Sequence, residues 1–437
     1  MPDSHVGRSG RRLTATVTDL EVARQRAFLV GVVRPPDDRE EAQRSLEELS
    51  LLTDTAGSDP LDGELVARDR IDPATYIGSG KARELAQVTA GLDIDVVVFD
   101  NALTPAQQRN LQKVFGCDVV DREAVILDIF AENATTRQGA LQVELALYRY
   151  NLPRLRGKGT ALSQQAGGIG ARRGPGETKL ETDRRRIQAR ITRLSRELED
   201  LDKVLATQRK ARKRSAAPHV ALVGYTNAGK STLLNRLTRA EVLTQDRLFS
   251  TLDSTVRKLE LPGGPPAVIS DTVGFVRRLP HHLVEAFRST LVEVQEADLL
   301  LHVVDAQDPD PDGQISAVRD VLSEIDARDV PELVVFNKTD AVDAVTLQRL
   351  RALHPEAVFV SALGGDGIGA LQAAVGDALD EQTTLLHLSV PYSRGDVVAA
   401  AYRLGDVIAV KHDESGTLLD VRVPPQAAGE LAEFETA

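Results

Sequence analysis

Residues 219–232 read HVALVGYTNAGKST, and this stretch decides the fold around it. An apolar segment, His219–Val223, runs directly into residues 224–231, GYTNAGKS, which fit the phosphate-loop pattern G-x-x-x-x-G-K-[ST] without a mismatch. Gly224 and Gly229 allow a tight turn, so that successive N–H groups and the start of the next helix point at one anion. The pattern predicts a strand, a phosphate-binding loop and a helix. A glycine-rich turn without a ligand is the alternative for this stretch taken alone.

The side chains at the end of this loop indicate the kind of ligand. Lys230 reaches the outer phosphates as a point charge, and the Ser231 hydroxyl is placed to ligate magnesium, a hard cation that prefers oxygen. The predicted ligand is therefore a nucleoside di- or triphosphate with Mg²⁺. The predicted contacts within the loop are Gly224, Tyr225, Thr226, Asn227, Ala228, Gly229, Lys230, Ser231 and Thr232.

Four segments downstream supply the remaining parts of a nucleotide site in the expected order. In the first, Thr251 is predicted to be the second protein hydroxyl on magnesium. In the second, Asp271 is predicted to hold magnesium through water, and the Gly274 N–H to sense the terminal phosphate. Lys230, Thr251 and Gly274 are thus the predicted catalytic groups, and Ser231, Thr251 and Asp271 the predicted metal ligands. The segments are Phe249-Ser250-Thr251-Leu252-Asp253, Asp271-Thr272-Val273-Gly274, Asn337-Lys338-Thr339-Asp340 and Ser361-Ala362-Leu363.

The third of these segments decides which base is bound. A carboxylate at Asp340 accepts hydrogen bonds from the N1–H and the exocyclic N2–H of guanine, and adenine has neither donor. A buried carboxylate left without donors costs several kcal/mol, enough for a discrimination of about 10⁴ or better. The sequence therefore predicts binding of GTP rather than ATP. Each segment alone is weak evidence, but all five in this order make a chance arrangement negligible.

Length and composition bound the rest of the chain. At 437 residues the chain is long enough for roughly two to four domains. It is 42% apolar, yet it has no uncharged apolar run of about 18 residues, and its first residues lack the apolar core of a secretory signal. The lone cysteine, Cys117, has no partner for a disulfide and is expected to fill core space. These features predict a cytoplasmic protein without a stable membrane anchor.

Charge is segregated along the chain. The net charge of −12 argues on its face against a nucleic-acid partner, but residues 149–216 hold 19 Lys and Arg against 7 Asp and Glu. A basic segment on an otherwise acidic protein is the expected footprint of a site directed at phosphate backbones. A solvated helix face is the alternative.

Before the basic segment, strands alternate with helices, which predicts a small parallel α/β domain over residues 25–130 after a flexible tail, residues 1–24. Within it, Tyr76–Ala82 (YIGSGKA) is a glycine turn that opens a helix. It lacks the Ser or Thr after the lysine, so we interpret it as a structural turn rather than a second nucleotide site. The expected strands are 27–33, 65–69, 93–100 and 118–120, and the expected helices are 42–52 and 105–115.

Two helical segments with apolar spacing follow, and they predict an antiparallel helical coiled-coil arm over residues 131–216. In the first helix the apolar positions end at Leu152, and Pro153 is expected to stop the helix. The second holds a heptad register in which only Arg184 is polar. Its apolar positions are Leu180, Ile187, Ile191, Leu194, Leu198, Leu201 and Leu205.

The connection between these helices, Arg154–Thr178, contains seven glycines. A connection of this length inside a compact protein is functional or disordered. We interpret it as a basic tip that enters folded RNA by shape and charge, because it offers no aromatic residue for stacking on bases; a floppy linker is the alternative. The predicted phosphate contacts in or beside it are Arg154, Arg156, Lys158, Arg172, Arg173 and Lys179.

The predicted architecture is therefore a multidomain α/β protein. A central P-loop GTPase domain, residues 217–383, has a doubly wound, mostly parallel sheet. Residues 384–437 read as strand, helix, strand, strand and short helix, which predicts a small C-terminal α+β domain without a catalytic constellation. His281, His282 and His412 are expected to be surface histidines rather than ligands.

The central segments resemble the translation-factor-like class of P-loop GTPases, and the flanking segments resemble the HflX family of ribosome-associated GTPases. The resemblance covers most of residues 70–390, and Ala134 departs from it at a position where much of that family has an arginine. The stretches that carry it are Tyr76–Ala82, Val97–Ala106, Asp121–Glu132, Leu141–Leu147, Leu152–Leu155, Gly174–Ile187, Gly224–Asn235 and Phe249–Arg257.

This resemblance implies a partner and a role. It implies a protein that binds the large ribosomal subunit, places its helical arm near the peptidyl-transferase region, and helps to split or rescue stalled ribosomes under stress. It implies no DNA partner, and we take a monomer as the default. An RNA-remodelling NTPase or chaperone acting through the basic arm, with ATP as a candidate nucleotide, is the alternative function; a membrane-associated switch lacks any lipidation motif.

The mechanism is constrained by one position. Ras-like GTPases orient the attacking water with a glutamine directly after the D-x-x-G segment, and here that position is Phe275, which has no hydrogen-bonding group. Arg277 and Arg278 lie near, but neither is an evident catalytic arginine in cis. We therefore predict slow hydrolysis in isolation and strong stimulation by the partner, where an in-trans group adds about 10³ to 10⁵ in rate.

Overall fold

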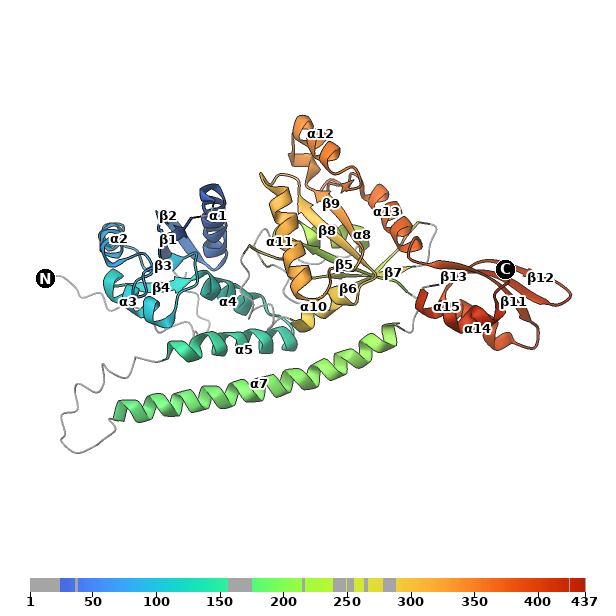
Figure 1. Cartoon of the computed structure of the whole chain (residues 1–437), viewed down its shortest axis with the longest axis horizontal. Coiled ribbons are helices and arrows are strands. Elements are labelled where there is room, and N and C mark those ends of the chain that lie inside the picture. The colour runs from blue at the N-terminus through green and yellow to red at the C-terminus, as the bar shows by residue number, and fades with distance from the viewer. Residues whose placement is uncertain are drawn as a thin grey trace, which may run out of the picture. The chain divides into compact units, whose positions relative to one another are not determined.

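The computed structural model describes residues 24–35, 38–155, 175–213, 217–238, 249, 255–262, 266–277, 288–423 and 425–436 (Figure 1). The chain divides into two compact units, one of Met1–Glu132 with Leu147–Ala189 and the other of Asn133–Ala146 with Arg190–Ala437. No helix in the described part of the chain has the length and apolar character that a bilayer span requires. The predicted tail, the tip of the basic connection and the segment around Thr251 lie outside the described residues, as do His281 and His282.

The first unit is built on a four-stranded sheet of order β2-β1-β3-β4, in which every pair of strands is parallel. The prediction of a parallel sheet here is confirmed. The first strand pair is longer than expected, because β2 begins seven residues before the predicted Leu65 and pairs along the whole of β1. The elements are β1 Gln25–Val33, α1 Arg39–Thr55, β2 Ser58–Ala67, α2 Ser79–Gly91, β3 Val96–Phe99, α3 Pro105–Phe115, β4 Asp118–Asp121 and α4 Arg122–Asn133.

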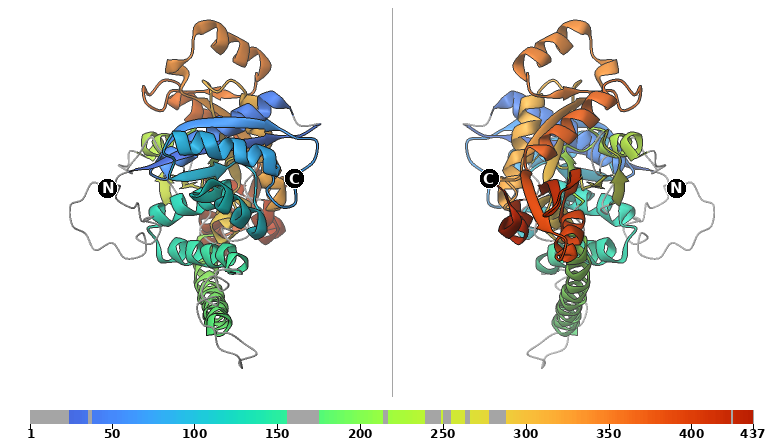
Figure 2. Two further views of the ribbon diagram at one scale, coloured as in Figure 1. Left: turned by 90° about the vertical axis from the view of Figure 1, so that its left-hand side faces the viewer. Right: turned by 90° about the vertical axis from the view of Figure 1, so that its right-hand side faces the viewer.

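One face of this sheet packs against α2 and α3, the helices that lie nearest the viewer in the left-hand view of Figure 2. Alternate side chains of β1, Phe28, Val30 and Val32, point into this core because successive residues of a strand face opposite sides. Cys117 packs at its margin, and burial raises the pKa of its thiol to about 11. The cysteine therefore behaves as an apolar, unreactive group, as expected from the sequence.

The glycine turn at Tyr76–Ala82 is held by contacts within the sheet domain. Gly78 has φ of +83° and caps α2, and the guanidinium of Arg68 fills the space beside it while donating to the carbonyl of Ile77. Lys81 donates to Glu84 at 2.7 Å and is also paired with Glu64. These carboxylates already neutralise the lysine, which favours the structural turn over a phosphate site.

Two long helices follow, α5 (Arg137–Arg154) and α7 (Pro175–Lys213). In the second unit, Arg190 donates to Glu144 at 2.8 Å and Gln138 donates to Asp202 at 3.3 Å. Residue numbers on α7 rise as those on α5 fall, so the two helices run antiparallel where these side chains meet. The predicted stop before Pro153 is wrong by two residues: the proline lies in the last turn of α5 and removes one hydrogen bond there, and the helix ends at the next residue, Arg154.

The second unit contains a six-stranded sheet of order β10-β9-β8-β5-β7-β6, parallel except for β6. The edge strand β6 was not predicted, because its sequence TVRKL is too short and too polar to show alternation. The elements are β5 His219–Gly224, α8 Lys230–Thr238, β6 Thr255–Leu259, β7 Ala267–Asp271, α10 Arg288–Gln295, β8 Leu299–Asp305, α11 Pro311–Glu324, β9 Glu332–Asn337, α12 Ala344–Leu353, β10 Val358–Phe359 and α13 Ile368–Asp380.

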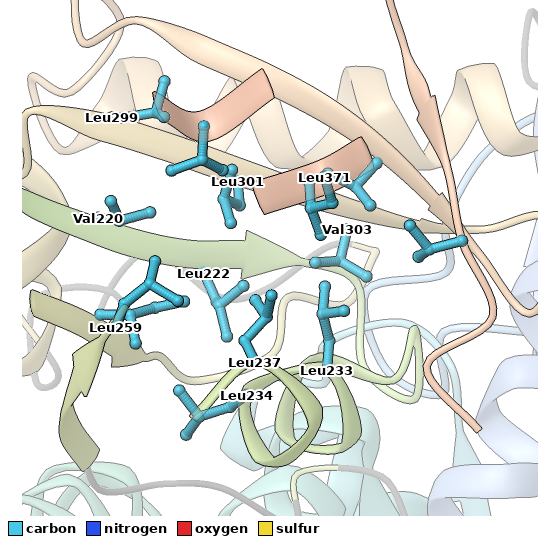
Figure 3. Close-up of a cluster of buried hydrophobic side chains, with 14 of the residues drawn as sticks. Val220, Leu222, Leu233, Leu234, Leu237, Leu259, Leu299, Leu301, Val303 and Leu371 are labelled. Carbon is cyan, nitrogen blue, oxygen red and sulfur yellow. The ribbon is translucent and has the colours of Figure 1, made fainter. Parts of the chain in front are cut away.

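Strand β5 is buried on both faces, which explains its continuous apolar sequence. Val220 and Leu222 face one core with the leucines of α8, and Figure 3 shows Leu233 and Leu237 of that helix pointing toward them. Ala221 and Val223 face the opposite core, formed with α10 and α11. The end of β5 is therefore fixed from both sides, and the loop that follows it starts from a rigid base.

The chain ends in a three-stranded antiparallel sheet of order β11-β13-β12. The elements occur in the order expected from the sequence, and one face of the sheet is covered by α14 and α15, seen in red in the right-hand view of Figure 2. They are β11 Thr384–Pro391, α14 Gly395–Leu404, β12 Asp406–His412, β13 Gly416–Val423 and α15 Pro425–Leu431.

Candidate functional site

The loop after β5 has a backbone that only glycine can follow at two places. Gly224 has φ of +146°, and a side chain there would collide with the carbonyl of Val303 on the neighbouring strand. Gly229 has φ of +88°, and a side chain there would collide with the amide of Asn337. Asn227, between them, also has a positive φ of +60°. The loop therefore curls tightly over the end of the sheet, as the sequence pattern predicts.

The ammonium group of Lys230 lies inside the curve of this loop. Lys230 is the first residue of α8, it is 6% exposed, and its Nζ donates to the carbonyls of Gly224 at 3.1 Å and Tyr225 at 2.7 Å. Burial lowers the pKa of Lys230 to about 8, and the charge of Asp271 partly opposes this. A buried ammonium held inside a ring of backbone groups is a focused positive charge for a phosphate.

Two of the three predicted metal ligands lie together. The Ser231 hydroxyl donates to the carboxylate of Asp271 at 2.7 Å, and the second oxygen of that carboxylate accepts from the N–H of Thr272 at 3.0 Å. A hydroxyl beside a carboxylate is a set of hard oxygen donors, which fits Mg²⁺. Thr251, the third predicted ligand, lies outside the described residues, together with Ser250, Leu252 and Asp253.

The segment after β7 is bonded to the loop through its backbone. The N–H of Thr226 donates to the Phe275 carbonyl at 2.7 Å, and the N–H of Phe275 donates to the Gly224 carbonyl at 3.1 Å. A side chain at Gly274 would come within 3.0 Å of the Lys230 Nζ and 2.8 Å of the Thr226 methyl. Gly274 is thus brought against the predicted phosphate site, where only a residue without a side chain fits.

The side chain of Phe275 points away from the site. It is 2% exposed and packs in the core beneath α10 and α11. Nearby, the Arg277 guanidinium donates to Asp310 at 2.8 Å and is 15% exposed. Neither residue offers a free polar group to a water beside the phosphate loop. Arg278 lies outside the described residues.

The predicted base-recognition segment begins with a buried asparagine. Asn337, 2% exposed, donates to the Ala228 carbonyl and accepts from the Ala362 N–H, both at 2.9 Å, and so ties three loops together. Lys338, with φ of +63°, donates to Asp305 at 2.7 Å. Asp340 lies exposed in the short turn that follows, Thr339–Ala341. The structure therefore separates a supporting residue, Asn337, from an accessible carboxylate, Asp340.

The last predicted segment, residues 361–363, is positioned by its own turn and by helix α8. The Ser361 hydroxyl accepts from the Gly364 N–H at 2.8 Å, and Leu363 is 76% exposed. Arg236 donates to the carbonyl of Ala362 at 2.9 Å and also to that of Leu363. Arg236 was not predicted, because nothing in its helical spacing reveals a partner more than a hundred residues away.

A second residue that sequence reasoning missed is Asn133, at the end of α4. Its side-chain amide donates to the carbonyl of Phe249 at 3.0 Å. Phe249 is 2% exposed and has φ of +57°, an unfavourable conformation for a bulky residue. This contact joins Phe249, two residues before the predicted Thr251 ligand, to the junction between α4 and α5. It depends on tertiary packing and leaves no local sequence signal.

One predicted phosphate contact is wrong. The guanidinium of Arg154 is 16% exposed, donates to Asp121 at 3.1 Å and to the Leu103 carbonyl at 3.0 Å, and stacks 3.4 Å from the ring centre of Tyr150. Its Nε also donates to Gln108 and its Nη1 to the Tyr150 carbonyl, so every nitrogen of the guanidinium has a partner inside the first unit. Arg154 anchors the start of the basic connection instead of contacting RNA. Arg156, Lys158, Arg172 and Arg173 lie outside the described residues, as does the side chain of Lys179.

Comparison with protein families divides the chain into three matched regions. Residues 43–131 match the family described as GTP-binding GTPase N-terminal, and residues 133–212 match the GTP-binding GTPase Middle Region. Residues 219–338, which contain the site described above, match the 50S ribosome-binding GTPase family.

Curated relatives resemble the chain over nearly its whole length. A GTPase HflX from Magnetococcus marinus is 43% identical over 94% of this chain and 95% of its own. The GTPase HflX of Escherichia coli is 42% identical over 92% of this chain and 94% of its own. Among solved structures, a crystal structure of SsGBP in complex with GDP aligns with 82% of this chain and 99% of its own at 22% identity and a TM-score of 0.46.

Proposed function

We propose that the nucleotide bound by this chain, which belongs to the HflX GTPase family and is a GTP hydrolase, controls its binding to the large ribosomal subunit. We further propose that it acts as a monomer in ribosome splitting or rescue. The observation that carries the nucleotide part is the convergence of Lys230, the Ser231–Asp271 pair and Gly274 on one glycine-bounded loop. The ribosomal part is supported by the match to the family described as 50S ribosome-binding GTPase.

The phosphates of GTP would lie in the loop of residues 224–231. Their oxygens would accept hydrogen bonds from the Nζ of Lys230, which donates to two loop carbonyls in the free chain. They would also accept from the N–H groups at the start of α8. Ser231 and Asp271 would hold Mg²⁺, which neutralises charge between the outer phosphates. The Gly274 N–H would approach the terminal phosphate, since that glycine lies against Lys230.

Guanine selection would depend on Asp340. Asn337 holds the phosphate loop and the segment of residues 361–363 at a fixed spacing. The guanine base would bind between these two loops. The exposed carboxylate of Asp340 is then free to accept both guanine donors. Adenine would leave that carboxylate without donors.

Hydrolysis would be slow without a partner. The position that carries the water-orienting glutamine in Ras-like enzymes is a buried phenylalanine, and Arg277 is engaged with Asp310. Neither of these described residues supplies a group that orients water or stabilises the transition state, so we propose that the partner supplies it, and such groups contribute about 10³ to 10⁵ in rate. The large subunit is the proposed source.

The switch would pass through the segment around Thr251. Loss of the terminal phosphate would release Thr251 and Gly274, and the freed segment begins at Phe249, whose carbonyl accepts from Asn133. Phe249 holds an unfavourable backbone angle, and such strain persists only where surrounding contacts maintain it. Release at Thr251 would thus reach the junction of α4 and α5, where the helical arm begins.

Co-sedimentation with separated ribosomal subunits tests this proposal. Protein loaded with a non-hydrolysable GTP analogue should pellet with large subunits at least tenfold more than protein loaded with GDP, and not with small subunits. A chain in which residues 156–174 are replaced by a short Gly-Ser linker should lose this binding and keep its GDP affinity. Equal binding in both nucleotide states would reject control by the nucleotide. Binding unaffected by the replacement would reject a role of the basic connection in binding the subunit.

A further inference from the structure

Arg184 is the one polar residue in the heptad register of α7 between Leu180 and Leu205, and the structure shows what surrounds it. It lines a pocket of about 480 Å³ in the first unit, formed by the start of α3, the end of α5 and α7. A volume of this size lies within the range of small-ligand sites. The lining residues are Thr104, Pro105, Ala106, Arg109, Leu152, Pro153 and Arg184.

The chemistry of this pocket is positive and otherwise apolar. Among the described residues that line it are two guanidinium groups, those of Arg109 and Arg184, and no Asp or Glu. Leu152, Pro153 and Pro105 supply low-dielectric walls, which strengthen the field of the two charges. Helix α3 begins here with the positive end of its dipole and α5 ends here with the negative end of its own, so the helix ends oppose each other and the two arginines set the sign of the charge. A planar guanidinium pair matches a tetrahedral anion with several oxygens.

The position of the pocket indicates where that anion comes from. Leu152 and Pro153 lie just before the basic connection and Arg184 lies a few residues after it, so the pocket sits where this connection leaves and rejoins the helices. The neighbouring Arg185 and Arg186 are about 80% exposed. None of the described residues that line the pocket is aromatic, so they offer nothing for stacking on a base.

We propose that this pocket binds a backbone phosphate of ribosomal RNA and so sets the register of the arm on the large subunit. The proposal rests on the proposed function for the identity of the partner. A polar residue at a heptad position reduces the apolar packing between helices and lowers stability. Binding of one phosphate by Arg184 and Arg109 would explain why an arginine is found there. Binding here is independent of base sequence.

A structural role for Arg184 makes a different prediction. A cation beside the last turn of α5 also interacts favourably with the carbonyl end of that helix. If that were its only role, replacing Arg184 would lower the melting temperature and leave RNA binding with an unchanged salt dependence. If the pocket binds phosphate, Arg184→Leu should keep or raise the melting temperature, because leucine completes the heptad, and should reduce the salt dependence.

The test compares Arg184→Leu with Arg185→Leu in the full-length chain, by affinity for large subunits across a series of salt concentrations. The two variants lose the same charge one residue apart, and Arg185 is 80% exposed and paired with Glu181. Arg184→Leu should weaken binding roughly tenfold and lower the slope of log affinity against log salt by about one. Arg185→Leu should change affinity less than threefold. Equal effects of the two variants would overturn the proposal.

Two further arms separate this proposal from the proposed function. Arg109→Gln should weaken binding like Arg184→Leu, and the double variant should lose less than the product of the two effects, because both arginines contact one phosphate; fully multiplicative losses would overturn the shared site. A short RNA duplex replaces the subunit in the second arm. If the wild type did not bind large subunits, the proposed function would be rejected. An affinity for the duplex that depends on Arg184 would still support a phosphate site in the pocket. A duplex affinity that does not depend on Arg184 would reject that site.

Discussion

At the scale of single residues, the site depends on groups whose properties are set by where they are buried. Lys230 is shielded from water and lies close to Asp271. The side-chain amide of Asn337 donates to a backbone carbonyl of one loop and accepts from a backbone N–H of another. Gly274 has no room for a side chain. Each of these residues therefore has a distinct measurable consequence when its charge or shape is changed.

Nucleotide binding should take up a proton above pH 8. Burial lowers the pKa of Lys230 to about 8 in the free chain, and a bound phosphate favours the charged form and raises that pKa. Affinity for GDP should therefore fall as pH rises through 8, by up to about tenfold per pH unit. Calorimetry in buffers of different ionisation enthalpy at pH 7 and pH 9 checks this, with uptake expected only at pH 9. Equal proton uptake at both values would contradict the assignment.

Asp340→Asn should change the base preference. An amide in place of the carboxylate accepts only one of the two guanine hydrogen bonds and faces the other donor with an N–H₂, so GTP affinity should fall at least a hundredfold. Competition by GTP, ATP and xanthosine triphosphate measures the preference. Asp329→Asn, which removes the same charge from an exposed position of the same unit, should leave it unchanged. A variant at Asp340 that still prefers guanine would exclude the residue from base recognition.

Gly274→Ala should discriminate between di- and triphosphate. The added methyl group would press against Thr226 and the Lys230 ammonium, at 2.8 and 3.0 Å from the built carbon. The Gly274 N–H would then be displaced from the terminal phosphate, so affinity for a GTP analogue should fall at least tenfold while GDP affinity changes little. Gly376→Ala, in an open part of α13, is the matched control. Equal losses for both nucleotides would show a general disruption of the loop instead.

At the scale of elements, the sequence predicts what is local and misses what depends on packing. The phosphate loop, the strands β5, β7, β9 and β10 that precede four of the nucleotide segments, and the parallel N-terminal sheet follow from spacing and apolar runs. Strand β6 was missed because its pairing with β7, not its own pattern, makes it a strand. The roles of Arg236 and Asn133 depend on carbonyl groups that lie more than a hundred residues away along the chain.

The wrong prediction for Arg154 has the same origin. In sequence, Arg154 belongs to a run of basic residues with a glycine-rich neighbour, which is typical of RNA contacts. In the fold, the last turn of α5 carries it onto Asp121, whose carboxylate is fully buried and also accepts from Tyr150. Only the tertiary structure distinguishes a basic residue that reaches outward from one that compensates a buried acid.

Arg154→Ala should therefore destabilise the first unit. Removal of the guanidinium leaves the Asp121 charge buried, which costs roughly 3 kcal/mol in the free energy of unfolding. Because burial already raises the pKa of Asp121, protonation should relieve this cost, and the loss should be smaller at pH 5 than at pH 7. Urea denaturation at both values measures it. Arg149→Ala, an exposed position on the same helix, should change stability by less than 0.5 kcal/mol, about the limit for surface substitutions; equal losses would reject the anchor.

At the scale of the whole molecule, the proposed mechanism couples the nucleotide site to a basic helical segment. The described contact between Asn133 and Phe249 is one physical link, because it ties the start of the proposed switch to the start of α5. Substituting Asn133 by Asp keeps its size but places a carboxylate against a carbonyl, and should reduce the difference between GTP-bound and GDP-bound affinity for large subunits. The same variant should keep its GDP affinity, since Asn133 does not touch the phosphate loop. An unchanged difference would remove this link from the account.

The rate of GTP hydrolysis, measured with and without purified large ribosomal subunits, shows whether the partner stimulates the reaction. Phe275 is buried and Arg277 is paired, so the chain alone should hydrolyse GTP slowly, and saturating large subunits should raise the rate by about 10³ or more. Small subunits should have no such effect. A fast rate in isolation, or a rate that does not change when large subunits are added, would contradict the account.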